Sequence, residues 1–363
     1  MTSAQAGNSR LATAKAGRKD EFYTQLSDIE KELRHYRRHF KGKVVYCNCD
    51  DPRASNFFHY FSYNFEKLGL KKLIAACYKN QDADLFSQND SERAVYLEYE
   101  GDKDGDRVPG ADEIAVKYFQ GDGDFRSAET VELLKQADIV VTNPPFSLFK
   151  EYVAQLVEHE KKFLIIGNMN AVTYKEIFPL IQDNRLWYGP SIRSGDREFG
   201  VPADYPLTAA GTRVDEHGNK FIRVKGVRWF TNLDYPERHE DLILFKPYTR
   251  EAYPKYVNFD AIDVASYKDI PVDYDGIMGV PVTLLDYFNP DQFEIIGNSD
   301  NGEQMAEIGV RQLGRDFIEA YRAGGGGTGH YSPGMRMLGL SEPKHRIVFK
   351  RILVRRKDAD GRS

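Results

Sequence analysis

The sequence has few cysteines, no long apolar run and no strong excess of either charge. Three cysteines among 363 residues are too few for a disulfide framework. Cys47 and Cys49 lie close together in the sequence and Cys77 is far from both, so a zinc site would lack its fourth ligand. We therefore predict no metal site, and three cysteines that serve as small buried hydrophobic residues.

Long apolar segments are also absent. No run of about 18 apolar residues exists, which argues against an ordinary transmembrane helix. Residues 1–18 are polar and rich in small side chains, without the hydrophobic region of a signal peptide. These features predict a disordered N-terminal tail and a cytoplasmic protein.

The charge balance gives only weak guidance about partners. The net charge of −5 does not indicate nucleic-acid binding by itself, but it conceals a local basic cluster near the C-terminus. This cluster consists of Arg346, Lys350, Arg351, Arg355, Arg356 and Lys357. The 22 Tyr and 22 Phe residues are more informative, because an enzyme that handles extruded bases needs aromatic faces for stacking, although most of these rings belong to a core.

Apolar strand-like runs alternate with stretches of helical periodicity through the first half of the chain. The predicted strands are residues 43–49, 72–78, 139–142 and 162–167, and the predicted helices are residues 25–40, 54–68 and 149–157 and a helix ending at 181. This order predicts an α/β fold with a doubly wound, mostly parallel sheet. Polar residues 80–116 are expected to form an inserted hairpin, and residues 189–225, rich in Gly, Pro, Asp and Arg, a second insertion.

The regular alternation of strand-like and helical segments ends toward the C-terminal part of the chain. Residues 241–246 are predicted to be a strand, and the following segment, 247–363, is irregular and bounded by prolines. Four consecutive glycines at 324–327 lack the preceding strand and following Lys-Ser/Thr of a phosphate-binding loop, which favours a mobile loop. Residues 346–356 alternate apolar and basic side chains, so they fit either a solvated edge strand or a strand that contacts phosphates.

The segment 138–146 (DIVVTNPPF) is the strongest candidate for a functional site. A buried strand that starts after Asp138 ends in a rigid elbow, whose residues are Asn143, Pro144, Pro145 and Phe146. The two prolines fix φ and remove two N–H donors, so carbonyl groups can be presented as acceptors beside an aromatic ring. This arrangement suits a planar amino group, while the alternative is an ordinary proline turn after a strand.

Two further segments carry candidate ligand-binding residues. Asp50 and Asp51 follow the first predicted strand, where α/β proteins bind ligands, although they could equally begin the next helix. Gly123 lets the backbone approach a ligand closely, and Asp124 and Phe125 then offer an acceptor and a ring.

Six segments together resemble the EcoRI-type adenine-specific DNA methyltransferases, and the resemblance covers nearly everything after residue 18. The segments are residues 20–24 (DEFYT), 49–52 (CDDP), 123–125 (GDF), 142–146 (TNPPF), 228–233 (RWFTNL) and 273–281 (DYDGIMGVP). The resemblance implies a Rossmann-like methyltransferase core over residues 19–246, with insertions near 80–116 and 189–225. It also implies that residues 247–363 form a C-terminal target-recognition region.

The resemblance also implies a cofactor, S-adenosyl-L-methionine, and residues that would bind it. Tyr23 and Thr24 match the family's N-terminal cofactor motif, whereas local pattern alone favours a hydrophobic staple at a helix entry. Asp50 and Asp51 occupy the first-strand loop, where Cys-Asp-Asp-Pro replaces the glycine-rich turn of the wider superfamily. Asp124 and Phe125 match the position that binds the cofactor's adenine.

In the implied reaction, Asn143 and Pro144 would accept the two N6 hydrogens of a flipped-out adenine, beside Pro145, while Phe146 stacks on the base. The partner would be double-stranded DNA, with a possible companion restriction endonuclease, and the protein a monomer or weak dimer. Two alternatives stay open at this point. One is methylation of RNA adenine or of a protein glutamine amide, and the other is an inactive DNA-binding protein on a methyltransferase scaffold.

Overall fold

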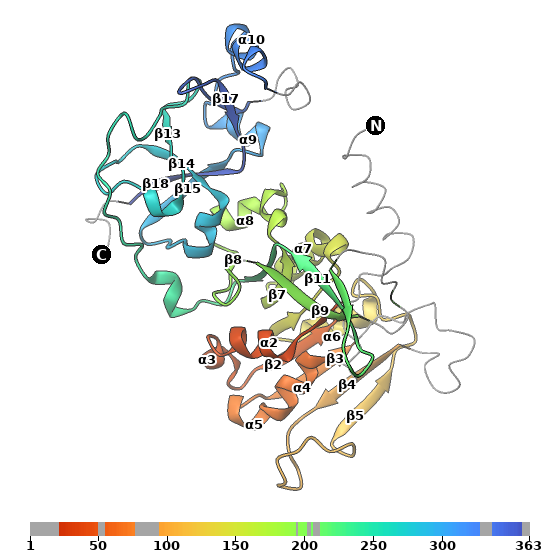
Figure 1. Ribbon diagram of the computed structural model, residues 1–363. Coiled ribbons are helices and arrows are strands. Elements are labelled where there is room, and N and C mark those ends of the chain that lie inside the picture. The colour runs from red at the N-terminus through yellow and green to blue at the C-terminus, as the bar shows by residue number, and fades with distance from the viewer. Residues whose placement is uncertain are drawn as a thin grey trace. The chain divides into compact units, whose positions relative to one another are not determined.

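The computed structural model describes residues 22–49, 55–76, 94–193, 195–201, 205, 211–326 and 336–357. These residues fall into two compact units (Figure 1). Unit 1 comprises Met1–Ala171 and Tyr188–Asp234, and unit 2 comprises Val172–Trp187 and Tyr235–Ser363. None of the helices in the described part of the chain has the length and apolarity needed to cross a lipid bilayer.

An eight-stranded sheet in the order β5-β4-β3-β2-β6-β7-β12-β8 forms the centre of unit 1. Its strands are β2 (Val44–Asn48), β3 (Lys72–Ala76), β4 (Val95–Tyr99), β5 (Ile114–Tyr118), β6 (Ile139–Thr142), β7 (Lys162–Asn168), β12 (Val227–Thr231) and β8 (Trp187–Tyr188). Strands β3, β2, β6 and β7 are parallel, whereas β4, β5 and β12 pair antiparallel to their neighbours. The mixed α/β class is therefore confirmed, but the predicted mostly parallel arrangement is limited to the central strands.

Helices pack on this sheet and bury its apolar faces. They are α2 (Leu26–Leu33), α3 (Arg37–Phe40), α4 (Asn56–Tyr63), α5 (Phe65–Leu68), α6 (Ala128–Gln136) and α7 (Phe149–Glu158). Helix α4 contacts β3, α6 contacts β2 and α7 contacts β7. Strands β2 and β6 are buried along their whole length, which explains why they appear in the sequence as continuous apolar runs.

Two helices that the sequence predicts as continuous are interrupted. The segment 25–40 divides into α2 and α3 because the backbone leaves helical geometry at Tyr36, with φ −115° and ψ 8°. The segment 54–68 divides in the same way at Asn64. Helix α5 then ends at Gly69, whose φ of +63° fits the glycine that the sequence places there.

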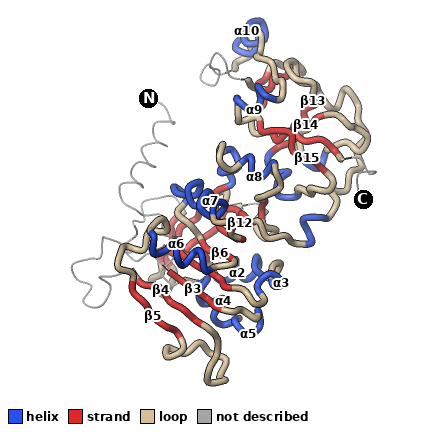
Figure 2. The backbone as a smooth tube through the Cα atoms, turned by 180° about the vertical axis from the view of Figure 1, so that it is seen from behind, coloured by secondary structure: helices blue, strands red, loops and turns tan. Residues whose placement is uncertain are grey.

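The first predicted insertion is confirmed as a hairpin within its described residues. Strands β4 and β5 pair over five residues at the edge of the main sheet, and Figure 2 shows their loop in tan beyond the two red strands. Three strands of the second insertion form a separate antiparallel sheet with β1, in the order β1-β9-β11-β10. Its strands are β1 (Tyr23–Thr24), β9 (Asp196–Val201), β11 (Lys220–Lys225) and β10 (Thr212–Val214).

Unit 2 contains a four-stranded sheet, a two-stranded sheet and three α-helices in its described residues. The larger sheet has the order β13-β14-β18-β15, with β13 (Ala261–Asp263), β14 (Ile277–Pro281), β18 (Arg351–Arg356) and β15 (Phe293–Asn298). The smaller sheet pairs β16 (Leu338–Leu340) with β17 (Arg346–Val348), and the helices are α8 (Phe178–Gln182), α9 (Gly302–Glu307) and α10 (Arg315–Ala323). Across both units, the described residues also include short 3-10 helices, which are η1 (Phe146–Leu148), η2 (Met169–Thr173), η3 (Pro236–His239), η4 (Tyr267–Asp269) and η5 (Val282–Tyr287).

Two predictions for the second half of the chain are wrong. Residues 241–246 are not a strand, since Ile243 is 88% exposed and Lys246 makes only an isolated bridge to Pro271. Residues 346–356 are not one edge strand, because Lys350 has a φ of +55° and separates β17 from β18. Strand β18 lies between β14 and β15, so it is an interior strand of its sheet. The mobile-loop prediction falls on the glycines 324–327, of which 324–326 follow α10 outside any helix or strand and 327 lies outside the described residues.

Candidate active site

The elbow lies at the carboxyl end of β6, beside β2. Asp138 starts the strand, since its Oδ2 accepts a hydrogen bond from the Val44 N–H at 2.8 Å and its carboxylate lies 3.6 Å from the Lys43 ammonium. The Thr142 hydroxyl donates to the Asn48 carbonyl and so joins the ends of the two strands. The chain therefore presents the next residue, Asn143, at the edge where a parallel sheet binds ligands.

The Asn143 side chain is oriented by a distant backbone carbonyl. Its Nδ2 donates to the Phe22 carbonyl at 2.6 Å, and the residue is only 6% exposed. A carbonyl can only accept, so this contact fixes which end of the amide carries the oxygen. The Oδ1 is buried and has no hydrogen-bond partner among the described residues. Asn143 therefore presents a free, desolvated acceptor.

The prolines and the ring form the elbow, but a local donor occupies one of its two proline carbonyls, contrary to the sequence prediction. The Pro145 carbonyl accepts from the Leu148 N–H at 3.0 Å, which starts η1, whereas the described residues give the Pro144 carbonyl no donor. The partly exposed Phe146 ring lies 6.0 Å from the Phe22 ring in an edge-to-face arrangement. The residues that follow Asn143 in the chain thus provide the Pro144 carbonyl, which has no donor among the described residues, and the partly exposed ring of Phe146.

Tyr23 and Thr24 lie in the strand β1, next to the Phe22 carbonyl that holds Asn143. Thr24 is 2% exposed, and its Oγ1 is buried without a hydrogen-bond partner among the described residues. The Thr24 carbonyl accepts from Asn56 Nδ2 at 2.7 Å. The structure therefore brings the predicted cofactor motif to the predicted elbow, over more than 100 residues of sequence. Asn56 was not predicted to take part, because an asparagine at a helix start looks ordinary in sequence.

Phe125 is fixed by α7, the helix that follows the elbow. Its ring centroid lies 5.1 Å from that of Tyr152, and its carbonyl accepts from Gln155 Nε2 at 2.9 Å. The Tyr152 hydroxyl donates to Asn48 Oδ1 at the end of β2. Burial raises the pKa of Tyr152 far above its ordinary value, so the hydroxyl stays a donor at neutral pH. Phe125 is therefore linked through Tyr152 to Asn48 at the end of β2. The Asn48 carbonyl in turn accepts from Thr142 at the end of β6.

Asp124 differs from the free acceptor that the sequence suggests. Arg126 binds both of its carboxylate oxygens, with Nε–Oδ1 at 2.9 Å and Nη2–Oδ2 at 2.7 Å. The hydrogen bond to Asp124 raises the pKa of Arg126, and the guanidinium also lies 5.2 Å from the centroid of the Phe125 ring. The Arg126 backbone N–H also donates to Asp124 Oδ1 at 2.9 Å, so Arg126 uses both lone pairs of that oxygen. No sequence pattern indicates this ion pair.

Asp50 and Asp51 lie outside the described residues, as does Cys77. The preceding residue, Cys49, has a φ of +81°, a conformation that usually favours glycine. Cys47 is buried as predicted, whereas Cys49 is partly exposed, so the prediction of a fully buried residue is wrong there.

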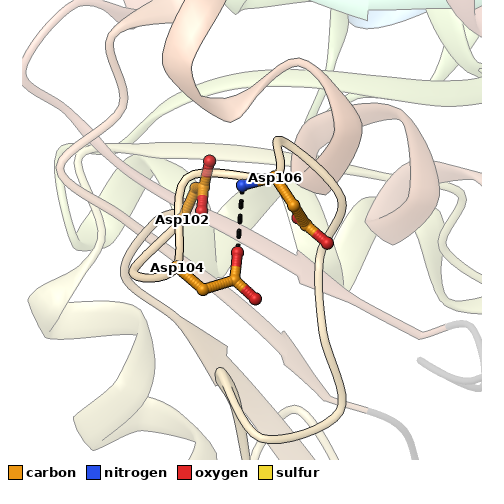
Figure 3. A group of neighbouring side chains, drawn as sticks. All are labelled: Asp102, Asp104 and Asp106. Carbon is orange, nitrogen blue, oxygen red and sulfur yellow. Dashed lines mark hydrogen bonds between the residues drawn. The ribbon is translucent and has the colours of Figure 1, made fainter.

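One acidic cluster in the described residues has ligand atoms at metal-binding spacing. The carboxylates of Asp102, Asp104 and Asp106 lie within 4.8 Å of one another in the β4–β5 loop (Figure 3). Asp102 accepts from the N–H groups of Gly105 and Arg107 at 2.6 and 2.8 Å, and Asp104 accepts from the Asp106 N–H at 3.0 Å. The bond from Gly105 is the main reason that the pKa of Asp102 is lowered. The carboxylates therefore stabilise the conformation of the β4–β5 loop by accepting hydrogen bonds from its own backbone N–H groups.

Comparisons with known proteins show which family the chain resembles over most of its length. The family described as adenine-specific methyltransferase EcoRI matches residues 10–357. The chain is 53% identical to the Type II methyltransferase M.EcoRI of Escherichia coli over 293 residues, which are 80% of this chain and 89% of that protein. It is 42% identical to the Type II methyltransferase M.MpnI of Mycoplasma pneumoniae, over 78% of this chain and 83% of that protein. For M.MgeORF184P of Mycoplasma genitalium the identity is 39%, over 78% and 84%. No solved structure shows significant similarity.

Proposed function

Because this chain belongs to the family of EcoRI-type adenine-specific methyltransferases, we propose that it transfers a methyl group from S-adenosyl-L-methionine to N6 of an adenine in double-stranded DNA. The family match confirms the resemblance found in the sequence. The names of the Type II relatives support DNA adenine methylation. The observation that carries the proposal furthest is the free, buried Oδ1 of Asn143.

The proposed chemistry explains why an acceptor must stand at the elbow. Adenine N6 is a weak nucleophile, because its lone pair is delocalised into the ring. Asn143 Oδ1 and the Pro144 carbonyl would accept the two N6 hydrogens and stabilise the positive charge that develops on nitrogen during attack. Phe146 would stack on the extruded base. This reaction needs neither a covalent protein nucleophile nor a titrating base at the elbow.

The cofactor fits the residues around β1 and α7. The buried Oγ1 of Thr24 has no partner among the described residues, as expected for a hydroxyl that binds a ligand. We propose that Tyr23 and Thr24 hold the methionine end, that Asp124 and Phe125 hold the adenine, and that Asp50 and Asp51 contribute from the first-strand loop. When bound, the cofactor supplies an electrophilic methyl group on its sulfonium.

The remaining assignments complete the proposal. Residues 19–246 would be the doubly wound cofactor-binding core, and residues 247–363 together with the second insertion would read the DNA target. The protein would act as a monomer or weak dimer, with a possible companion endonuclease for the same site. Methylation of RNA or of a glutamine amide is less well supported, because the relatives are named as Type II enzymes. A pure binder would have no need of a free buried acceptor.

The first prediction tests Asn143 directly. Asn143→Ala should lower the methyl-transfer rate on duplex DNA by roughly 100- to 1,000-fold or more, since one preorganised polar contact commonly accounts for that much. Cofactor affinity by calorimetry and the melting temperature should change little. The assay uses labelled cofactor with separate DNA, RNA and glutamine-peptide acceptors, followed by mapping of methylated adenines. An Asn143→Ala protein that methylates DNA at the wild-type rate would refute the assignment of the elbow.

A further inference from the structure

The strand β1 is only two residues long, yet it connects the elbow with the second sheet of unit 1. Along one edge it pairs with β9, with Tyr23 opposite Gly200 and Thr24 opposite Phe199. The carbonyls of Phe22 and Thr24 accept from Asn143 Nδ2 at 2.6 Å and from Asn56 Nδ2 at 2.7 Å. Alternate carbonyls along an extended strand point to the same side, so the two asparagines hold the same edge of β1.

Asn56 is the better anchored of the two asparagines. It is the first residue of α4, whose N-terminus is capped by Ser55, since the Ser55 Oγ accepts from the Phe57 N–H at 3.2 Å. The opposite face of this helix is fixed in the core through Phe57 and Phe61, which are each at most 1% exposed. The Asn56 amide therefore reaches β1 from a rigid element.

Asn143 depends on the position of the strand that Asn56 holds. Its amide presents Oδ1 to a substrate only while Nδ2 is bound to the Phe22 carbonyl. Rotation of the amide by about 180° would exchange the oxygen for an NH₂ group, which cannot accept a hydrogen bond from an amino group. The Phe22 carbonyl is two residues from the Thr24 carbonyl, so a displacement of one moves the other.

We propose that Asn56 is a positioning residue for methyl transfer. By binding the Thr24 carbonyl, it fixes β1 and therefore the Phe22 carbonyl that orients the catalytic amide of Asn143. The inference rests on the proposed function, because it assigns Asn56 a part in presenting the acceptor oxygen to the adenine amino group.

The decisive variant is Asn56→Asp, which keeps the size of the side chain but lacks the donor. An acidic residue in the first turn of a helix is favourable, so α4 should persist and the melting temperature should change little. At saturating cofactor and DNA, the single-turnover rate of methyl transfer should fall roughly 10- to 100-fold, the usual effect of a small misplacement of a catalytic group. The DNA dissociation constant should stay at its wild-type value.

Two further variants serve as matched controls for Asn56→Asp. Asn56→Gln, which keeps the amide donor on a longer side chain, should recover part of the lost rate. His59→Gln, on the exposed side of the same helix, should leave the rate unchanged. A wild-type single-turnover rate for Asn56→Asp would overturn the proposal.

A double-mutant cycle separates positioning from a general structural effect. Asn143→Asp keeps an acceptor oxygen at the elbow but loses the donor to the Phe22 carbonyl. If Asn56 acts through that contact, Asn56→Asp should lower the rate no further in the Asn143→Asp background. An equal loss in both backgrounds would show that Asn56 acts elsewhere. Failure of the proposed function looks different, because the wild-type protein itself would then not methylate adenine in DNA.

Discussion

Asn143 carries out two tasks with one side chain. Its Nδ2 is bound to the Phe22 carbonyl, and its Oδ1 is buried without a partner among the described residues. An unsatisfied buried acceptor costs about 1–3 kcal/mol, so a protein keeps one where a ligand satisfies it. In the proposed reaction, the Asn143 amide is thus desolvated and oriented before the adenine binds, which lowers the reorganisation needed during methyl transfer.

Phe146 allows a test of the proposed contact with the target base. Phe146→Ala removes the ring that would stack on the extruded adenine, and such stacking is worth about 1–3 kcal/mol. The value of kcat/KM for DNA should therefore fall by roughly 5- to 150-fold, at about 1.4 kcal/mol for each tenfold change. Steady-state kinetics with varied DNA would measure this effect.

The control for Phe146→Ala is a variant that keeps a ring. Phe146→Tyr should stay near the wild-type value of kcat/KM, and cofactor affinity should be unchanged in both variants. Equal losses for the tyrosine and alanine variants would mean that packing against Phe22, 6.0 Å away between ring centroids, matters more than stacking on the base.

At the level of secondary-structure elements, local pattern predicts some parts well and others poorly. Strands β2, β6 and β7 are apolar along their length because both faces are covered, so their sequence identifies them without tertiary information. Residues 241–246 have an equally apolar pattern, but within the described residues they form only the isolated bridge between Lys246 and Pro271, and Phe245 is 66% exposed. Pairing depends on what lies beside a segment, which its own residues do not encode.

One carboxylate on β4 forms ion pairs with both neighbouring strands of the main sheet, in addition to the backbone pairing of β4 with β3. Glu98 on β4 lies 2.9 Å from the Lys72 ammonium on β3 and 2.6 Å from that of Lys117 on β5. Burial acts to raise the pKa of Glu98, but hydrogen bonds from the two lysines outweigh it and the pKa is lowered. The folded pKa therefore lies below the unfolded one, and the pair stabilises the protein only while Glu98 is ionised.

Glu98→Gln should lower the free energy of unfolding by about 1 kcal/mol at pH 7, a value typical of a partly buried pair. The stabilisation is fully present above the unfolded pKa of about 4.5 and is lost as the pH falls through the folded pKa. The difference between the two proteins should therefore shrink below about pH 4.5. Urea titrations across this pH range would measure the difference in the free energy of unfolding.

Glu100→Gln is the matched control, because Glu100 is 62% exposed and lies 3.8 Å from Lys72, so this variant should have almost no effect on the free energy of unfolding. If the free energies of unfolding of the wild-type and Glu98→Gln proteins differed by the same amount at every pH, the role assigned to the ionised Glu98 would be wrong.

At the level of the whole molecule, ligand binding should be visible as stability. A cofactor at 100 times its dissociation constant stabilises a folded protein by about 2.7 kcal/mol. With roughly 2–4 °C per kcal/mol for a unit of this size, the melting temperature should rise by roughly 5–10 °C. S-adenosyl-L-methionine should produce such a shift, which scanning fluorimetry would measure.

Thr24→Val provides the matched variant for this shift. It keeps the shape of the buried side chain and removes a hydroxyl that has no partner among the described residues, so the melting temperature without ligand should be unchanged or slightly higher. The shift at the same cofactor concentration should be smaller. An undiminished shift would remove Thr24 from the cofactor site.

The net charge of the whole chain says little about its DNA contacts. Arg351, which belongs to the basic C-terminal cluster, is bound at 2.9 Å by the buried carboxylate of Asp263. Arg355 lies 3.1 Å from Glu294. Part of the basic pattern in residues 346–356 is therefore used inside unit 2, and the phosphate-contacting role of this strand stays a prediction.

The sequence by itself determined the central strands, the elbow from Asn143 to Phe146 and the family, because apolar runs, proline geometry and motifs are local properties of the chain. Only the tertiary structure decided which contacts these residues make. The Asn143 amide is oriented by a carbonyl 121 residues earlier, and Thr24 is held by Asn56, 32 residues later. Arg126 occupies the Asp124 carboxylate, and β18 became an interior strand. Hydrogen-bond partners and strand neighbours follow from the packing of distant segments, whereas periodicity reports only which face of a segment is buried.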